Sequence, residues 1–450
     1  MTSLEAVADS LNRTVKILLD NGEASSLEEA ERIFAQYRLQ IVVGPDVARN
    51  TVLQAALLTA VNCASRTFLG GVSVVGATGP LCVRLPSSKD LRDAVVQLGG
   101  QPMAGVELAV PTVLIGDVET LVEPLAIRAT FTEWCGGVIP MARQLRLAER
   151  GNFTPAGVLA GAIAVAEMFQ RVRGGNPFAC RRSAGLDLWC PKRDWLRGEG
   201  AAKLDRLPSS ACLIGLGNLG QSYLWVMGLL PYADIAANLV LQDMDVLAPA
   251  NLSTSLLTTQ ALLGMRKTRA MAQWAEARGF RTTIIERKFE GNFQITPQEA
   301  PVALVGVDNG LARQDVESVG FTRVIEAGLG AGPQDFMGID VHTLPATRTS
   351  REMWQVEEAT DTDIARPAYT ALLQASQDRC GTVRLAGRSV GAPFVGATAA
   401  CLVIAELVRL TLGGERHELI SCHLRELTNR IVIAGQAWSP FNPGTILLAV

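Results

Sequence analysis

The chain has 450 residues, more than the roughly 250–300 at which a single hydrophobic core stops growing, so we expect two or three domains. Its 41 basic and 44 acidic residues give a net charge of -3 without a long run of Lys or Arg, which argues against a nucleic-acid partner. Nine cysteines are spread through a chain that starts without a charged and apolar leader, so we expect reduced thiols and a cytoplasmic location.

The most apolar stretches, residues 155–166 and 393–405, are too short to span a membrane. A spanning helix needs roughly 18–20 apolar residues, and each stretch continues into a glutamate, Glu167 or Glu406. We therefore expect core helices and no membrane partner.

The first 38 residues carry charge and a helical period, which predicts an N-terminal helical segment. After it, buried strand patterns at residues 39–44, 72–76 and 110–117 alternate with helical runs. This alternation is typical of a parallel sheet and predicts an α/β unit over residues 39–175.

The same order of patterns returns after residue 210, which indicates a repeat. Residues 157–175 align without gaps on residues 396–414, and both segments have an apolar helical run, an Ala-Glu pair and a closing Gly-Gly. Short apolar helices match by chance fairly often, but the repeated strand order favours a duplication. The strands expected in the second unit are residues 211–215, 239–245 and 300–308.

The chain therefore divides into two α/β units with additional segments, and the main boundary is expected near residue 200. The predicted divisions are a helical segment (1–38), a first unit (39–175), a connector (176–208), a second unit (209–340), an insert (341–392), and the closing helix and C-terminal strands of the second unit (393–450).

The second unit opens with the loop GLGNLG, whose glycines are Gly215, Gly217 and Gly220. Such a loop after a strand lets the backbone turn tightly and approach a phosphate, whose charge is favoured by the N–H groups of the following helix. Asp243 lies at the end of the next strand, where a carboxylate can accept hydrogen bonds from ribose hydroxyls. NAD-dependent enzymes and ATP-using enzymes share both features, so at this point either nucleotide is possible.

Further polar residues at fixed offsets favour ATP. They are Asp243 and Asp245, Asn251, Gly264 with Lys267, and Asp308 with Asn309, followed by Arg313. Their spacing resembles the adenylating domain of the E1 and ThiF/MoeB family. Singly, each could be a turn or surface residue. Together, at the carboxyl ends of strands, they favour a nucleotide site.

The resemblance implies roles for these residues. Asp243 would bind the ribose, Lys267 and Asn251 would contact the phosphates, and Asp308 would bind Mg²⁺. A lysine and a divalent ion suit attack on the α-phosphate, because negative charge builds on its oxygens.

One position departs from the family pattern. The family has an arginine three residues after the asparagine, whereas this chain has Thr254. Either Arg266 or an arginine from the N-terminal unit would have to replace that cation, or the phosphate is held more weakly.

The first unit lacks the residues of a nucleotide site. In place of the glycine loop it has Pro45 and Asp46, and its second strand ends in Gly76 and Ala77 instead of an acid. Members of the family act as pairs of such folds. We therefore expect two Rossmann-like, ThiF/E1-type folds in one chain, the first degenerate, forming an intramolecular pseudo-dimer. The first unit could still lend a cation, and the candidates are Arg38 and Arg49.

The family also uses a cysteine nucleophile, and Cys380 in the insert matches it best. Arg379, Arg384 and Arg388 lie close to it in the sequence, and positive charge favours the thiolate. Cys135 has the comparable place in the first unit and is interpreted as a relic or a core residue. No pair of Cys-x-x-Cys motifs is present for structural zinc.

The resemblance implies an E1-like activating enzyme, most similar to the E1-like proteins of bacterial ubiquitination-like operons in antiviral defence. With ATP and Mg²⁺ it would adenylate the C-terminal glycine of a ubiquitin-like protein, form a thioester on Cys380 and pass it to an E2-like protein. A homodimer is compatible with the family. Three alternatives stay open: a sulfur-carrier or other ThiF-type adenylating enzyme without E2 transfer, an NAD-dependent Rossmann oxidoreductase, and a catalytically silent scaffold.

Overall fold

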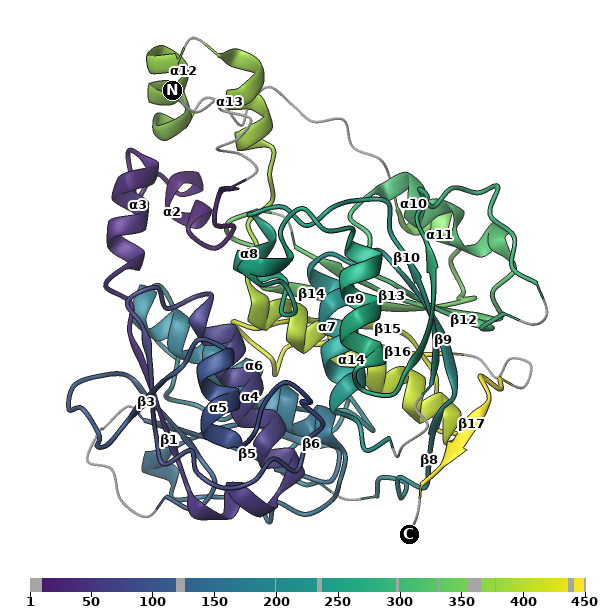
Figure 1. Ribbon diagram of the computed structural model, residues 1–450, viewed down its shortest axis with the longest axis horizontal. Helices are drawn as coiled ribbons and strands as arrows, with labels where there is room; N and C mark the ends of the chain where they lie inside the picture. Colours follow the sequence, from purple (N-terminus) through teal and green to yellow (C-terminus); the bar gives the residue numbers. More distant parts are fainter. Residues whose placement is uncertain are drawn as a thin grey trace.

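The computed structural model contains two twisted sheets, with helices packed between and around them (Figure 1). The structure describes residues 10–118, 126–198, 200–232, 237–296, 299–330, 332–354, 366–376, 378–435 and 441–448.

The first sheet has seven strands in the order β3-β2-β1-β4-β5-β6-β7. Neighbouring strands from β3 to β5 are parallel, and the pairs β5-β6 and β6-β7 are antiparallel. β7 comes from the segment that was predicted to be a connector, so this segment adds a strand to the sheet. The strands are β1 (Leu39–Val43), β2 (Val72–Val75), β3 (Gln101–Met103), β4 (Thr112–Ile115), β5 (Ile127–Thr132), β6 (Cys135–Pro140) and β7 (Ala184–Asp187).

The second sheet has eight strands in the order β11-β10-β9-β12-β13-β14-β15-β16. It is parallel from β11 to β13 and antiparallel beyond β13. The predicted boundary at residue 340 falls inside β14. The strands are β9 (Ser210–Ile214), β10 (Asn238–Gln242), β11 (Arg281–Ile285), β12 (Val302–Val305), β13 (Arg323–Leu329), β14 (Gly338–Leu344), β15 (His417–His423) and β16 (Ile431–Ala434).

The first four strands along the chain take the same places in each sheet. The first strand lies in the middle, the second and third lie on one side of it, and the fourth lies on the other side. The predicted alternation of buried strands and helices is therefore present in each unit. A separate two-stranded ribbon joins β8 (Arg206–Pro208) to β17 (Thr445–Leu447).

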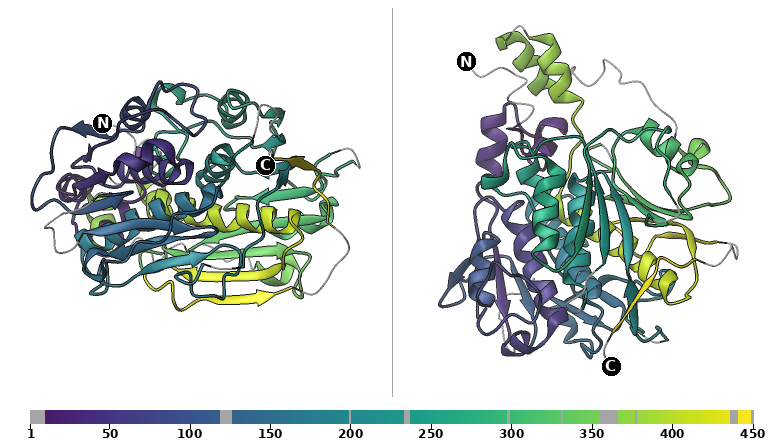
Figure 2. Two further views of the ribbon diagram at one scale, coloured as in Figure 1. Left: turned by 90° about the horizontal axis from the view of Figure 1, so that it is seen from below. Right: turned by 45° about the vertical axis from the view of Figure 1, so that its right-hand side comes forward.

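Four buried helices form the centre of the contact between the two units (Figures 1 and 2). The two segments aligned in the sequence become α6 and α14, and the rings of Phe169 and Phe394 on these helices lie 5.5 Å apart. On the flanking helices, Trp225 Nε1 donates a hydrogen bond of 2.9 Å to Thr59 Oγ1. The two units thus share one apolar core. The four helices are α4 (Thr51–Ser65), α6 (Thr154–Arg173), α7 (Asn218–Leu229) and α14 (Pro393–Thr411).

Helix α14 is apolar on every side, as expected of a helix surrounded by protein. By length and composition it could cross a membrane, but 89% of its most apolar window is buried inside the structure. This agrees with the expectation of a core helix.

The N-terminal segment packs against the insert (Figure 1). Asp20, on α2, accepts hydrogen bonds from Lys16 Nζ at 2.7 Å and from the Tyr369 hydroxyl at 2.6 Å, and it pairs with Arg366 at 2.9 Å. The helices involved are α2 (Lys16–Asp20), α3 (Leu27–Phe34), α12 (Pro367–Ser376) and α13 (Arg379–Ala386).

The remaining helices are short. They are α5 (Leu91–Gln97), α8 (Asn251–Thr254), α9 (Lys267–Glu276), α10 (Gly310–Asp315) and α11 (Ser350–Met353), with 3-10 turns at η1 (Pro45–Arg49), η2 (Met141–Arg143), η3 (Gln260–Leu262) and η4 (Val316–Val319).

Candidate functional site

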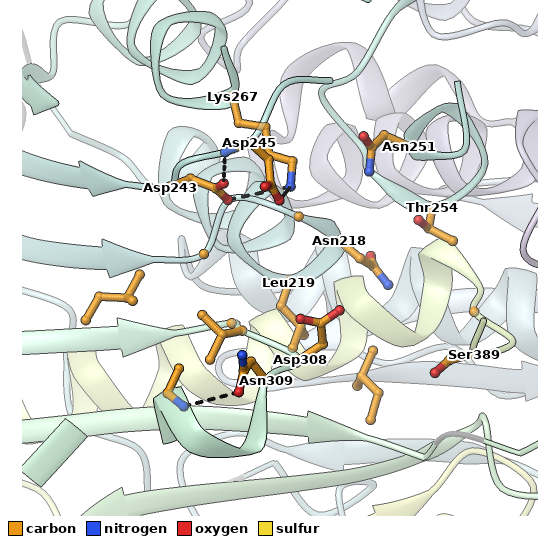
Figure 3. A pocket seen from close by; sticks show the side chains of 18 of the residues that line it. Asn218, Leu219, Asp243, Asp245, Asn251, Thr254, Lys267, Asp308, Asn309 and Ser389 are labelled. Carbon is orange, nitrogen blue, oxygen red and sulfur yellow. Dashed lines mark hydrogen bonds and ion pairs between the residues drawn. The ribbon is translucent and has the colours of Figure 1, made fainter. Parts of the chain in front are cut away.

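A pocket of about 850 Å³ lies at the carboxyl ends of β9, β10 and β12 (Figure 3). β9 has β10 on one side and β12 on the other, so the chain crosses over in opposite directions from β9. In an open α/β sheet, ligands bind in the crevice outside the carboxyl ends of the strands at such a switch point. The pocket therefore lies at the place where this strand order predicts that a ligand binds.

The three glycines of the loop each meet a different steric demand. Gly215 has a φ of +84°, which L side chains rarely adopt. A Cβ on Gly220 would lie 2.0 Å from the carbonyl oxygen of Gly215, so α7 could not pack this closely against the loop. A Cβ on Gly217 would meet nothing within 4 Å, and Gly217 lines the pocket. The open backbone at Gly217 can be approached by a ligand.

Asp243 holds the loop in place from the end of β10. Its Oδ2 accepts the backbone N–H of Leu216 at 2.7 Å, and its Oδ1 accepts that of Asp245 at 2.8 Å. Its side chain is 8% exposed, whereas that of Asp245 is 59% exposed. Asp243 thus orders the site, while Asp245 lies at its open side.

Lys267, the first residue of α9, lies between these two carboxylates (Figure 3). Its Nζ is 2.8 Å from Asp245 Oδ2 and 3.7 Å from Asp243 Oδ2. The two carboxylates therefore hold the lysine ammonium, a compact positive charge, at the wall of the pocket.

Asn251 and Thr254 are on the single turn of α8, and both line the pocket. Asn251 Oδ1 accepts the backbone N–H of Ala248 at 2.9 Å, and its amide nitrogen points into the pocket (Figure 3). The nitrogen is the donor that a phosphate oxygen needs. Thr254 is buried and lies against Gly391.

Asp308 and Asn309 follow β12 and lie across the pocket from Lys267 (Figure 3). Asp308 is exposed to the pocket, and Asn309 caps α10 by accepting two of its backbone N–H groups. Arg313 is buried below them, where its Nε donates to the carbonyl oxygen of Val307 at 2.8 Å and its guanidinium lies 4.2 Å from the ring centre of Trp354. Asn309 therefore has a structural role as a cap, whereas Asp308 faces the pocket.

The structure brings the predicted nucleotide-site residues to one pocket. Those that line it are Gly215, Gly217, Asp243, Asp245, Asn251, Lys267, Asp308, Asn309 and Arg313. Gly220 supports the loop from behind.

Several pocket residues were not predicted for the site. Arg13 comes from the N-terminal segment, and its backbone N–H donates to Ser253 Oγ at 3.1 Å, so no local pattern could have placed it there. Asn218 begins α7 inside the GLGNLG loop, and its Oδ1 is buried without a hydrogen-bond partner among the described residues. A polar side chain within the glycine loop was the available signal. Other unpredicted pocket residues are Arg287, Lys288 and Ser389.

Arg266, Arg38 and Arg49, the named candidates for an additional cation, are not among the described residues that line the pocket. Arg266 donates to the carbonyl oxygen of Met244, and Arg38 forms a two-bond ion pair with Glu107 at 2.7 and 2.6 Å. Arg49 ends η1 in the first unit. The Met244 carbonyl oxygen and Glu107 therefore hold Arg266 and Arg38 in their positions.

Cys380 lies in α13. Its side chain lies outside the described residues. Residues 387–391, which follow α13 directly, line the pocket, so the cysteine-bearing helix is joined to the site by a short segment. Cys135 is buried in β6, and burial raises the pKa of its thiol, as expected of a core residue.

The oxygen donors of the pocket suit a magnesium ion that is bound together with phosphates. Within the described ranges, no group of three or more His, Cys, Asp and Glu side chains could hold a metal ion. Mg²⁺ commonly takes only one or two carboxylates plus phosphate oxygens and waters, so the exposed carboxylate of Asp308 fits such an ion.

The corresponding place in the first unit holds an ion-pair cluster. Arg146 pairs with Asp46 at 2.5 Å, with Asp117 at 2.9 Å and with Glu149 at 2.5 Å. Asp46 and Asp117 follow β1 and β4, so the cluster lies at the carboxyl ends of these strands.

Comparisons with known proteins give a consistent picture. Residues 38–188 match the family described as BilD N-terminal domain, and residues 207–414 match that described as BilD C-terminal domain. The bacterial E1-like protein BilD of Collimonas sp. (strain OK412) is 43% identical over 419 residues, which cover 91% of this chain and 90% of that protein.

Among solved structures, E. coli MccB is similar at 11% identity and a TM-score of 0.34, covering 54% of this chain and 67% of that chain. E. coli tRNA N6-threonylcarbamoyladenosine dehydratase, TcdA, is similar at 13% identity and a TM-score of 0.29, covering 46% of this chain and 86% of that chain. These values are low, so the assignment depends on the BilD matches. The chain belongs to the family of bacterial E1-like proteins that includes BilD.

Proposed function

We propose that the chain activates the C-terminal glycine of a ubiquitin-like protein with ATP, carries it as a thioester on Cys380 and transfers it to an E2-like protein. One observation carries the proposal. Asp243, Lys267 and Asp308, which are far apart in the sequence, surround one pocket at the switch point of the second sheet. Membership of the E1-like family supports the same reaction class.

In the first step, a carboxylate oxygen of the terminal glycine attacks the α-phosphorus of ATP. The bond between that phosphorus and its bridging oxygen breaks, and pyrophosphate leaves. Asp243 would accept the ribose hydroxyls, and the Gly217 backbone would allow close approach of the phosphates. Lys267 would exchange its contact with Asp245 for the phosphate oxygens on which charge develops.

Asn251 and two arginines would complete the phosphate contacts. Arg13 and Arg388 both line the pocket, and their charges would compensate for the neutral Thr254. Neither comes from the position where the family has its arginine, so the positive charge is supplied from two other segments.

Asp308 would hold Mg²⁺ together with the phosphates. The ion would supply charge neutralisation at the α-phosphate and at the departing pyrophosphate. Asp308 has the exposure that this role needs.

In the second step, the Cys380 thiolate attacks the acyl carbon and AMP leaves with the bonding electron pair. The segment 387–391 connects α13 to the pocket, so a change in this segment would bring the cysteine toward the adenylate. In the same proposal, the first unit is a degenerate partner of the second. The Arg146 cluster lies where a nucleotide would bind, and the pairing of α6 with α14 relates the two units.

ATP–pyrophosphate exchange in the presence of candidate ubiquitin-like proteins tests the proposal. Asp308→Ala should abolish exchange, whereas Cys380→Ala should retain exchange and lose only a reducible covalent adduct. Exchange without any adduct on Cys380 would favour a ThiF-type enzyme without E2 transfer. If the wild-type chain does not bind MgATP, the adenylation proposal fails and the scaffold alternative is supported.

A further inference from the structure

Arg66 of the first unit reaches across to the nucleotide-site half of the molecule. It follows α4, and its guanidinium donates to the carbonyl oxygens of Leu252 at 2.6 Å, Leu256 at 3.1 Å and Thr258 at 3.1 Å. Asn62, one turn earlier on α4, accepts a hydrogen bond from Arg66 Nε and donates to the same Leu256 oxygen at 3.1 Å. Two side chains of the first unit therefore hold one short segment of the second.

This segment begins at the phosphate side of the pocket. Helix α8 carries Asn251 and Thr254, and Leu252, which Arg66 contacts, lies between them. A helix of one turn has little stability of its own, because most of its backbone groups have no partner within the helix. The orientation of Asn251 is thus expected to depend on what holds the carbonyl groups of α8 and the residues after it.

The second unit holds the same segment from the other side. The buried Gln221, on α7, accepts the backbone N–H of Leu257 at 3.1 Å and the hydroxyl of Thr258 at 3.0 Å. Its amide nitrogen donates to the carbonyl oxygen of Leu216 in the glycine loop at 3.1 Å. One hydrogen-bond network therefore connects Arg66 to both elements that would contact phosphate.

The chemistry of Arg66 suits this position. Burial lowers the pKa of its guanidinium to about 10, so it still carries a charge at neutral pH. A planar guanidinium offers several donors in fixed directions and can reach three carbonyl oxygens together, which a lysine ammonium on a flexible chain cannot reproduce.

We propose that Arg66 is a positioning residue for the nucleotide site, which acts by holding α8 so that Asn251 faces the phosphates. This inference rests on the proposed function, because it takes the pocket to bind MgATP. It gives the first unit a role in the reaction without a nucleotide of its own.

The test measures the dissociation constant of MgATP by titration calorimetry with the full chain and without a ubiquitin-like protein. We expect Arg66→Ala to weaken binding about tenfold and Arg66→Lys about threefold, since a charged donor to several carbonyl oxygens is lost or reduced. Arg84→Ala is the matched control. Arg84 also crosses from the first unit, but it donates to the carbonyl oxygen of Arg278 at 3.2 Å, which is not among the pocket-lining residues. Its substitution should change the constant less than about twofold.

A double-mutant cycle separates positioning from general destabilisation. If Arg66 acts through Asn251, Arg66→Ala should weaken binding far less in an Asn251→Ala background than in the wild type. Thermal unfolding of each variant reports its folded fraction. If Arg66→Ala does not fold, the cycle uses Arg66→Lys, which keeps the positive charge.

The outcomes distinguish this inference from the proposed function. If the wild type binds MgATP and both Arg66 variants bind it equally well, or if the effects of Arg66 and Asn251 add independently, the inference is overturned and the proposed function is unaffected. If the wild type does not bind MgATP, the proposed function is overturned, and the inference with it.

Discussion

Glu167 and Glu406 occupy matching positions in the paired helices α6 and α14, but their carboxylates have different partners. Glu406 contacts the guanidinium of Arg409 and accepts the backbone N–H of His417 at 3.0 Å. Glu167 accepts the backbone N–H of Cys180 at 2.7 Å, and its Oε1 is buried without a hydrogen-bond partner among the described residues. The two glutamates thus lie at matching positions in different surroundings.

The different surroundings predict a pH-dependent stability. Burial raises the pKa of Glu167 to about 7, although the Cys180 N–H and Arg182 act in the opposite direction. Because the folded pKa lies above the unfolded value, the contribution of Glu167 to stability is fully present below about pH 4 and is lost as the pH rises through 7. Glu167→Gln cannot ionise, so at pH 8 it should be more stable than the wild type by on the order of 3 kcal/mol.

Urea unfolding of wild type and Glu167→Gln at pH 5 and pH 8 measures this difference. Glu406→Gln is the control, since it removes one partner of a buried ion pair and should destabilise by about 3–5 kcal/mol at both pH values. A Glu167→Gln effect of equal size at both pH values would contradict the assigned pKa.

Much of the fold could be predicted because its core elements have simple patterns. The central strands of both units are buried apolar runs, and the match of residues 157–175 to 396–414 indicated the two helices that pair in the core. Strand β7 was missed because its four residues lie in a segment rich in Arg, Cys, Trp and Pro with no clear period. The tertiary pairing with β6 decides its conformation.

Residues of the site that follow a strand could be predicted from the sequence. Residues brought to the site by packing between distant segments could not. Asp243 follows β10 and Asp308 follows β12, and these two strands lie on either side of β9. The strand order therefore brings both side chains to the same edge of the sheet. Arg13 is 240 residues from Ser253, whose hydroxyl oxygen accepts the Arg13 backbone N–H, and no sequence pattern connects the two residues. Arg38 was proposed for its charge, but the local acid Glu107 determines its position.

Two alanine substitutions in the glycine loop should affect different properties: one the stability of the fold, the other the affinity for MgATP. Gly220→Ala would place its Cβ 2.0 Å from the Gly215 carbonyl oxygen and should destabilise the fold by about 3 kcal/mol through overpacking. Gly217→Ala meets nothing within 4 Å and should change stability by less than about 0.5 kcal/mol. It should nevertheless weaken MgATP binding, because the new methyl group lies where the phosphates approach.

Urea unfolding and titration calorimetry together separate these two effects. Gly105→Ala, also in open space but in the first unit, should alter neither quantity. Normal MgATP affinity in Gly217→Ala would show that the phosphates do not approach this part of the backbone.

Arg13 is predicted to supply the charge that Thr254 lacks. Arg13→Ala removes the guanidinium but keeps the backbone N–H that binds Ser253, so the segment should stay in place. We expect the KM for ATP in pyrophosphate exchange to rise about tenfold, as for loss of a hydrogen bond to a charged group. Arg38→Ala, which breaks only an exposed pair with Glu107, should leave the KM unchanged. Equal KM values for both variants would exclude this role for Arg13.

The last prediction concerns the contact between the N-terminal segment and the cysteine-bearing helices. Lys16 and Asp20 are 1% and 4% exposed, and Lys16 also donates to the Ala386 carbonyl oxygen at the end of α13. Asp20→Asn still offers an acceptor to Tyr369 but leaves the buried Lys16 ammonium without its carboxylate, which should cost about 3–5 kcal/mol. Amide hydrogen exchange in α12 and α13 should therefore become faster.

The double variant Lys16→Met/Asp20→Asn identifies the cause. Replacing a buried ion pair by groups without charge is often neutral for stability, so exchange in α12 and α13 should return most of the way to the wild-type rate. If the single variant exchanges as slowly as the wild type, the buried pair is not what holds the two helices. If the double variant stays as fast as the single one, the carboxylate acts mainly on Arg366, which lies 2.9 Å from Asp20, and the Arg366 contact is then the one that keeps the Cys380 helix next to the N-terminal segment.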